Sequence, residues 1–282
     1  ILAARLRTLP AAIAPVLLGC ALAYGEQKSH LLAAVAAMLG AILIQIGTNF
    51  ANDYFDFING ADTEDRIGPT RATQAGLITP TNMKWAFVLT FAATVPIIVY
   101  LTVRGGAPIV WIGVASIASG ILYTGGPRPL GYMGLGDVFV LIFFGPIAVA
   151  GTHYVQSLQW SIDAMVIGLA SGLISTAILV VNNLRDVSTD ATVGKNTLVV
   201  RFGQQFARWE YTLCLLGAAA ISAFYAVDRH WIWGSVLALS LAIPPLRSIW
   251  KDQGRALDPN LAKTAKVLVA YSVTFSVGWI LS

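Results

Sequence analysis

Nine long apolar segments, separated by mostly short polar stretches, constrain the fold of this chain more than any other feature. Hydropathy places them near residues 8–25, 31–52, 82–103, 107–124, 136–157, 162–183, 209–227, 231–249 and 262–281. A transmembrane helix needs about 20 predominantly apolar residues, and only helices and closed barrels satisfy every backbone polar group inside a bilayer. We therefore predict an all-α, polytopic membrane protein with about nine transmembrane helices, forming one domain over residues 1–282.

The low charge content excludes an ordinary soluble domain. Charged residues make up 11% of the chain, whereas soluble domains contain about 25%. The net charge of +4 is explained by the Lys and Arg bias of cytoplasmic loops. We therefore expect a membrane lipid environment and no nucleic-acid partner.

The basic residues predict the orientation of the chain. When the N-terminus and the loops after the second, fourth, sixth and eighth segments are placed together, that side holds all the Lys and Arg residues except Lys28, Arg104 and Arg229. Because cytoplasmic loops are enriched in Lys and Arg, this side is predicted to be cytoplasmic. We expect a multi-pass protein of the bacterial inner membrane, with a cytoplasmic N-terminus and, after nine spans, a C-terminus on the outer face.

The second apolar segment leads into a concentration of acidic residues, within residues 49–71. Five of the 14 acidic residues lie there, namely Asp53, Asp56, Asp62, Glu64 and Asp65. Asn49 and Asp53 are four residues apart, as are Asn52 and Asp56, so each pair shares one face of a helix. We predict that this window forms half of a binding site.

A second acidic cluster follows the sixth apolar segment. Asn182, Asp186 and Asp190 repeat the four-residue spacing twice. Because the second and sixth segments run in the same direction, both clusters are expected at the same side of the membrane. A single aspartate would most simply be a cap or a solvated charge at a helix end, but two matched clusters predict the two halves of one site.

The carboxylates predict a divalent-metal site for a phosphorylated substrate. Mg²⁺ binds through a few carboxylates together with substrate oxygens and water, and the lack of clustered Cys and His in the sequence argues against zinc or copper. The metal would polarise a leaving diphosphate as a Lewis acid. The predicted metal ligands are Asp53, Asp56, Asp62, Asp186 and Asp190.

Basic residues interleave with both clusters and are predicted to bind diphosphate oxygens, because ionised donors make the stronger hydrogen bonds to phosphate. They are Arg66, Arg71, Arg185, Lys195 and Arg201. A third stretch, residues 123–137, is rich in Gly and Pro, which permit tight turns and close backbone approach to a ligand. We expect Tyr123 and Arg128 of this stretch to face the same cavity as the aspartates.

Several stretches share a recognisable residue pattern: NDYFDFINGAD, DRIGPTR, YTGGPRPLGYMGLGD, NNLRDVSTDATVGKNTL and, near the N-terminus, ARLRTLPAAIAPVLLG. Together they resemble the UbiA superfamily of intramembrane aromatic prenyltransferases over essentially the whole chain. Within that superfamily they are most similar to the branch that prenylates 1,4-dihydroxy-2-naphthoate for menaquinone synthesis.

The resemblance implies nine helices around a central cavity, in which two Asp-rich motifs bind Mg²⁺ and polyprenyl diphosphate. With the residues above, it assigns catalysis to Asp53, Asp56, Asp186, Asp190 and Tyr123. Substrate binding is assigned to Asn49, Asn52, Arg66, Arg71, Arg128, Asn182, Asn183, Arg185 and Lys195. The sequence departs from the wider family at Gly60, where a third motif aspartate is common and the next acid here is Asp62. It departs again at Tyr123, which Arg128 follows at five residues rather than a lysine at four.

The activity implied by the resemblance is Mg²⁺-dependent transfer of a polyprenyl group to 1,4-dihydroxy-2-naphthoate, with loss of diphosphate and CO₂, to give demethylmenaquinone. One alternative is a related enzyme with another aromatic acceptor, such as 4-hydroxybenzoate or homogentisate. Another is a phosphatidyltransferase acting on a CDP-alcohol, although the chain lacks that family's Asp-Gly and Ala-Arg signature. A third is an ion-coupled transporter, whose carboxylates would be expected near the bilayer midplane rather than at helix ends.

Overall fold

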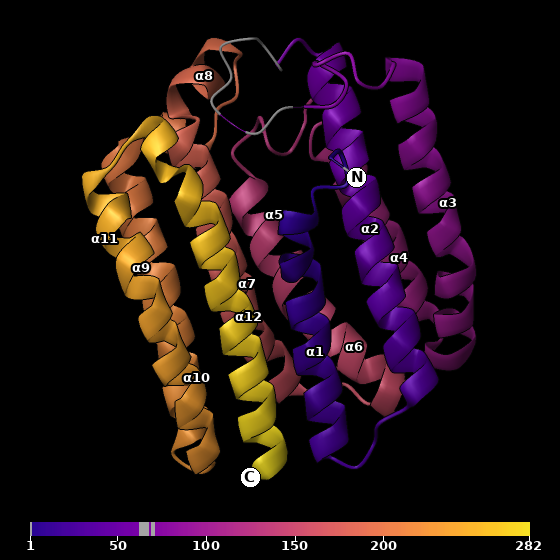
Figure 1. Cartoon of the computed structure of the whole chain (residues 1–282). Helices are drawn as coiled ribbons and strands as arrows, with labels where there is room; N and C mark the ends of the chain where they lie inside the picture. Colours follow the sequence, from indigo (N-terminus) through magenta and orange to yellow (C-terminus); the bar gives the residue numbers. More distant parts are fainter. Residues whose placement is uncertain (1, 62–67, 69–70) are drawn as a thin grey trace.

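The computed structural model of the chain describes residues 2–61, 68 and 71–282, and every regular element in them is helical (Figure 1). The α-helices are α1 (Leu9–Gly25), α2 (Leu31–Ile58), α3 (Pro80–Gly105), α4 (Ala107–Leu122), α5 (Gly136–Ile142), α6 (Ala148–Ser157), α7 (Ile162–Arg185), α8 (Val187–Thr192), α9 (Leu198–Ala226), α10 (Trp233–Ala238), α11 (Ile243–Lys251) and α12 (Asp258–Leu281). Short helical turns join some of them, namely η1 (Leu6–Thr8), η2 (Phe143–Ile147), η3 (His230–Ile232), η4 (Leu239–Ala242) and η5 (Gly254–Leu257).

All nine predicted segments are helical, and the prediction of an all-α polytopic membrane protein is confirmed. Among the described residues, 7 helical stretches are long and apolar enough to cross a membrane by length and composition. The other two predicted segments differ from these. The first, α4, is a shorter apolar helix of 16 residues. The second, α9, carries Arg201, Arg208 and Glu210 in its first half and is not among the 7.

The fifth predicted segment is interrupted rather than continuous. The path from α5 to α6 passes through η2, a π-helical turn in which Gly145 has non-helical dihedrals (φ −116°, ψ −114°). Pro146 follows it, and proline removes a backbone donor and clashes with the preceding turn, which kinks a helix. The kink lets this segment approach α7 closely. A Cβ at Gly172 of α7 would clash with the carbonyl oxygen of Leu141, so only glycine fits.

The helices pack as neighbouring pairs around the bundle, with α1 beside α12, α2 beside α3, and α7 beside α9 (Figure 1). The largest buried apolar cluster lies in the second half of the fold, between α7, α9 and α12, with α1 against them. The first half contains smaller buried apolar clusters and a cavity. Helices α1 to α6 line this largely apolar and partly open cavity of about 310 Å³.

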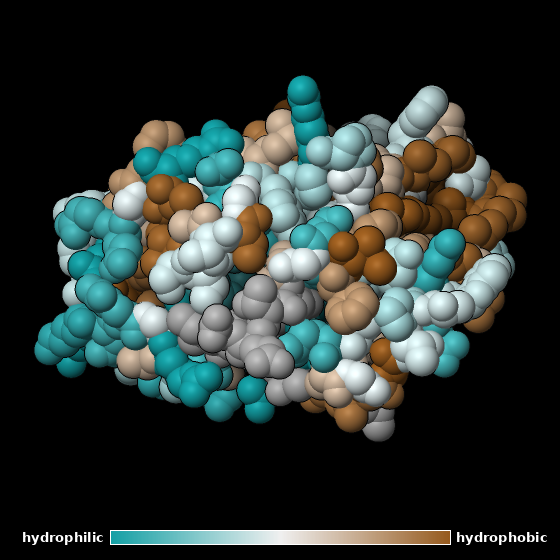
Figure 2. All heavy atoms as spheres, turned by 90° about the horizontal axis from the view of Figure 1, so that it is seen from above, coloured by the Kyte–Doolittle hydropathy of each residue, from teal (hydrophilic) through white to brown (hydrophobic). Residues whose placement is uncertain are grey.

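The end of α2, the end of α7, and α8 all lie at one end of the bundle, while the C-terminus lies at the opposite end (Figure 1). Figure 2 views the first of these ends from above and shows hydrophilic residues spread over its face. The two sequence clusters predicted to form one site are therefore at the same end of the molecule.

Candidate active site

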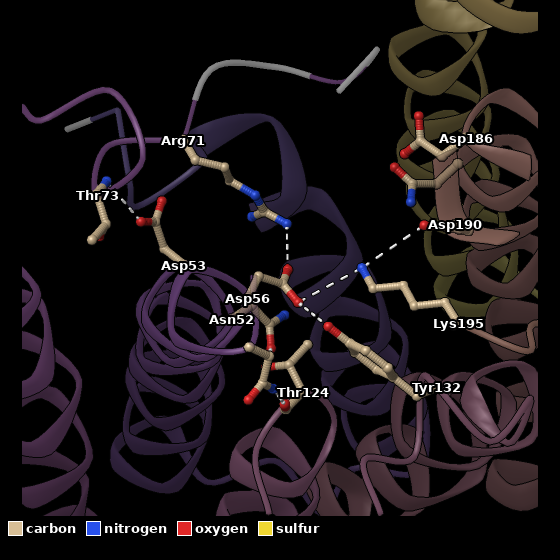
Figure 3. Close-up of polar contacts among 12 residues, drawn as sticks. Asn52, Asp53, Asp56, Arg71, Thr73, Thr124, Tyr132, Asp186, Asp190 and Lys195 are labelled. Atoms are coloured by element: carbon tan, nitrogen blue, oxygen red, sulfur yellow. Dashed lines mark hydrogen bonds and ion pairs between the residues drawn. The ribbon is translucent and has the colours of Figure 1, made fainter. Parts of the chain in front are cut away.

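Asp56, near the C-terminus of α2, is the centre of a buried polar network (Figure 3). Its Oδ2 accepts a hydrogen bond from Nη2 of Arg71 at 2.9 Å. Its Oδ1 accepts one from the hydroxyl of Tyr132 at 3.3 Å and lies 3.6 Å from Nζ of Lys195. One carboxylate therefore meets two cations and a phenol that come from three different loops.

Lys195 connects this network to the second acidic cluster. Its Nζ lies 3.6 Å from Oδ1 of Asp56 and 3.8 Å from Oδ1 of Asp190, and it also lies over the ring of Tyr132, 5.1 Å from the centroid. The structure thus places carboxylates of both predicted motifs around a single positive charge (Figure 3).

Asp53 faces a different way from Asp56. Its two oxygens accept hydrogen bonds from the backbone N–H groups of Ala72 and Thr73, at 3.1 and 3.0 Å. The side chain is buried, and its two hydrogen bonds fasten the segment that follows Arg71 to helix α2. In this arrangement Asp53 positions the loop that delivers Arg71, whereas the sequence predicts it as a metal ligand and catalytic group.

The two asparagines of the first motif also bind protein groups. The amide of Asn49 donates to the carbonyl of Ala4 and to the hydroxyl of Thr8, each at 2.9 Å, which fastens the N-terminal segment to α2. Asn52 accepts a hydrogen bond from the hydroxyl of Thr124 at 2.9 Å. Both asparagines line the large cavity, so they mark the border between its apolar wall and the polar network.

Arg185 is held by the second cluster itself. Its Nε and Nη2 bind the two oxygens of Asp186 at 2.8 and 2.7 Å. Nη1 binds Asp258 of α12 at 2.8 Å, and Nη2 also binds Asn182 at 2.8 Å. Arg185 and Asp186 are both buried. The sequence predicts Arg185 as a diphosphate ligand, but here its donors join the end of α7 to α12.

The remaining residues of the second cluster lie close to this pair. Asp190, in α8, is buried, as is Asn183 of α7. The backbone N–H of Lys195 donates to the carbonyl oxygen of Asp190 at 3.0 Å. This bond closes the turn after α8 and keeps Lys195 beside the acidic residue it contacts.

Tyr123, which directly follows α4, lines the cavity, as does Asn52 of α2. The structure therefore places a hydroxyl-bearing residue of the third stretch and an asparagine of the first motif in the same cavity wall.

The expectation that Arg128 faces the cavity is wrong. Arg128 is exposed and is not part of the cavity wall. It closely follows Gly126, whose positive φ of 86° turns the chain. The arginine is at the surface of residues 123–135 rather than in the cavity wall.

Arg201 also has a role that the sequence does not predict. Its Nη2 donates to the carbonyl oxygen of Met133 at 2.7 Å, and the backbone N–H of Asn196 donates to the carbonyl oxygen of Tyr132 at 2.9 Å. These bonds dock the third stretch against the segment after α8.

Four further residues of the first motif, Asp62, Glu64, Asp65 and Arg66, lie outside the described residues.

Sequence reasoning missed Tyr132 and Thr124, whose hydroxyls bind Asp56 and Asn52, and Thr73, whose backbone N–H binds Asp53. Tyr132 lies in the Gly-rich run of the third stretch, and a phenol between glycines is the one available signal. The threonines follow no spacing rule, because their partners are distant in sequence and meet them only in the fold.

The donor set fits a magnesium ion that is completed by its substrate. Among the described residues, no group of three or more His, Cys, Asp or Glu side chains could hold a metal ion alone. Mg²⁺ is typically bound by one or two carboxylates together with substrate phosphates and water. Asp56 and Asp190 provide two carboxylates around one cationic position, which is the number that this type of site requires.

The sequence can be compared with characterised proteins. The profile of the UbiA prenyltransferase family matches residues 12–270. The 1,4-dihydroxy-2-naphthoate octaprenyltransferase of Haemophilus influenzae is 38% identical, over 98% of this chain and 93% of its own length. The enzyme of the same name from Escherichia coli is 38% identical, over 99% and 94%, and that of Mycobacterium tuberculosis is 36% identical, over 96% and 92%.

Solved structures share the fold. A UbiA homolog from Archaeoglobus fulgidus bound to GPP and Mg²⁺ superimposes with a TM-score of 0.68 at 16% identity, over 98% of this chain and 99% of the other. The apo structure of a UbiA homolog from Aeropyrum pernix K1 gives a TM-score of 0.70 at 13% identity, over 98% of each chain.

Proposed function

Because this chain belongs to the UbiA prenyltransferase family, we propose that it transfers a polyprenyl group from polyprenyl diphosphate to 1,4-dihydroxy-2-naphthoate. Diphosphate and CO₂ leave, and the product belongs to menaquinone synthesis. The near full-length similarity to 1,4-dihydroxy-2-naphthoate octaprenyltransferases supports both the acceptor and a long prenyl donor.

The observation that carries this proposal is the junction between the apolar cavity and the charged network. Asn52 and Tyr123 line the cavity, and Asp56 follows Asn52 by about one helical turn on α2. A substrate with a long apolar chain and an anionic head fits such a junction, with the chain among α1 to α6 and the diphosphate beside Arg71 and Lys195.

The charged network would bind and activate the diphosphate. Asp56 and Asp190 would hold Mg²⁺, which supplies charge neutralisation and Lewis acidity to the leaving group. Lys195 and Arg71 would supply positive charge for the diphosphate oxygens, and such charge is worth most where water is excluded. Of the predicted ligands, Asp53 and Asp186 are engaged with the backbone and with Arg185, so we assign them supporting positions.

The apolar cavity would protect the allylic cation that forms when the carbon–oxygen bond to diphosphate breaks. Its wall includes the stacked rings of Phe139 and Phe143, 5.9 Å apart, and aromatic faces attract cations. Exclusion of water leaves the acceptor ring as the nucleophile. The ring carbon that bears the carboxylate forms the new carbon–carbon bond, and loss of CO₂ returns an electron pair to the ring. The transfer is redox-neutral, so the quinol form of demethylmenaquinone is released.

We further propose that the whole chain acts as one domain with its site on the cytoplasmic side. The predicted cytoplasmic side holds nearly all of the basic residues, and the Asp56 network lies at the end of α2 that belongs to this side. A charged acceptor and a diphosphate head would then reach the site from the cytoplasm.

The proposal is tested by offering the purified protein octaprenyl diphosphate, Mg²⁺ and either 1,4-dihydroxy-2-naphthoate or 4-hydroxybenzoate, and identifying the product by mass. We expect a prenylated, decarboxylated product with the naphthoate alone, and none when EDTA removes the metal. A product with only the benzoate would refute the assigned acceptor while leaving prenyl transfer intact.

A substitution in the cavity wall should affect long and short prenyl diphosphate donors differently. Ala41 of α2 lines the cavity, so Ala41→Phe should fill space that the prenyl chain occupies. We expect kcat/KM for octaprenyl diphosphate to fall about tenfold or more, in the range of a misfit in an apolar pocket, with a smaller loss for dimethylallyl diphosphate. Leu39→Phe is the matched control, because Leu39 is on the same helix but exposed. Equal losses of kcat/KM with both donors would mean that the prenyl chain does not occupy this cavity.

A further inference from the structure

Lys195 occupies a position that its expected role alone does not explain. A lysine that only binds diphosphate has no reason to contact both acidic motifs, yet its Nζ lies 3.6 Å from Asp56 and 3.8 Å from Asp190. The side chains of Asp56 and Asp190 are 2% and 11% exposed, so their charges are largely removed from water. Buried carboxylates without a cation are costly, because desolvation penalises each charge. Lys195 supplies a positive charge that lies near both carboxylates, in addition to that of Arg71 at Asp56.

The backbone around Lys195 is fixed, while its side chain has the length to move. The N–H of Lys195 bonds to Asp190, and the next residue, Asn196, bonds to Tyr132. The preceding residue, Gly194, has a φ of 74° and open space where a Cβ would be. The side chain extends from this anchored turn and is 18% exposed. A lysine stem has several rotatable bonds, so the ammonium group can shift without moving the loop.

We infer that Lys195 is the counter-ion that Asp56 and Asp190 share when no metal is bound, and that it holds the place between them until metal and diphosphate arrive together. This inference rests on the proposed function. A divalent ion that enters alone must displace the ammonium group from both carboxylates and leave it without an anionic partner. Diphosphate removes this penalty, because its oxygens accept the displaced ammonium group while the carboxylates hold the metal.

The consequence is a positive coupling between metal and diphosphate. Each ligand raises the affinity of the other by the same factor, since linkage between two binding sites is reciprocal. Lys195 is in this sense a positioning and selectivity residue. It suppresses metal binding to the free protein and favours metal that arrives with substrate.

The test measures metal binding rather than turnover. Mn²⁺ is titrated into the purified protein, free Mn²⁺ is followed by electron paramagnetic resonance, and the titration is repeated with saturating geranyl diphosphate. For Lys195→Met we expect the free protein to bind Mn²⁺ about tenfold or more tightly, the direction and size expected when a close charge pair is removed. The stimulation of Mn²⁺ binding by geranyl diphosphate should shrink in the same variant.

Two control variants accompany Lys195→Met. Lys195→Arg keeps the charge and should leave Mn²⁺ affinity close to that of the wild type. Lys251→Met removes an exposed lysine of α11 and should change neither affinity nor coupling. If Lys195→Met elutes as a folded monodisperse protein but binds Mn²⁺ no more tightly than wild type, the counter-ion role is refuted. If wild type binds no Mn²⁺ even with geranyl diphosphate, the metal dependence in the proposed function fails as well, which separates the two failures.

Discussion

Replacing Asp56 by Asn should reduce kcat/KM for prenyl transfer by roughly 10²–10³-fold or more, the loss typical when one preorganised electrostatic group is removed from an active site. Asp56 is the carboxylate that meets Arg71, Tyr132 and Lys195. Asparagine preserves its shape but removes its charge. Metal binding, the position of Arg71 and the placement of Lys195 should therefore all weaken together, and the readout is product formation under saturating Mg²⁺.

The control for this substitution is Asp228→Asn. Asp228 is exposed and follows α9 at the opposite end of the bundle, so its neutralisation should leave activity within about twofold, as expected for a surface substitution. Near wild-type turnover in Asp56→Asn would refute the assignment of Asp56 to the metal and diphosphate site.

Replacing Arg185 by Gln should act mainly on folding. The substitution leaves the buried carboxylate of Asp186 without its counter-charge and removes the link to Asp258. Breaking a buried ion pair from one side costs about 3–5 kcal/mol, so we expect a large fall in the midpoint of thermal unfolding, followed in detergent by the loss of monodisperse protein. Asp258 is 41% exposed on its side chain, so most of the cost comes from Asp186.

Arg128→Gln is the comparison for Arg185→Gln. It removes an arginine that the sequence also assigns to substrate but that is exposed, and it should leave thermal stability unchanged. A different outcome for Arg185→Gln, with unchanged thermal stability and a raised KM for polyprenyl diphosphate, would support the diphosphate role that the sequence predicts.

Local patterns explain why much of the site could be predicted. The four-residue spacing of Asn52 and Asp56 fixes one helix face, and the same spacing identifies Asp190 in the second cluster. Spacing gives no information about which partner a side chain chooses. Asp53 has the same four-residue spacing, to Asn49, yet it binds two backbone N–H groups. It does so because the loop after Arg71 passes beside Asp53 on α2.

The same limit applies to the cations. Arg185, Arg201 and Lys195 are equivalent as charges in sequence, but the first joins α7 to α12, the second supports the loop at Met133, and the third reaches Asp56 and Asp190. Their roles depend on contacts between segments that are far apart in the chain. No local rule distinguishes a cation that stabilises the fold from one that faces the site.

The sequence by itself determined that the chain is helical and spans a membrane, and that two acidic motifs lie at one end of it. These features follow from hydropathy and helical periodicity, which are properties of single segments. The tertiary structure alone decided that Asp56, Tyr132, Lys195 and Asp190 form one network and that the cavity lies within α1 to α6. The physical reason is that burial and charge pairing depend on which segments pack together, and in this chain that packing depends on close contacts such as Gly172 against the kink at Gly145.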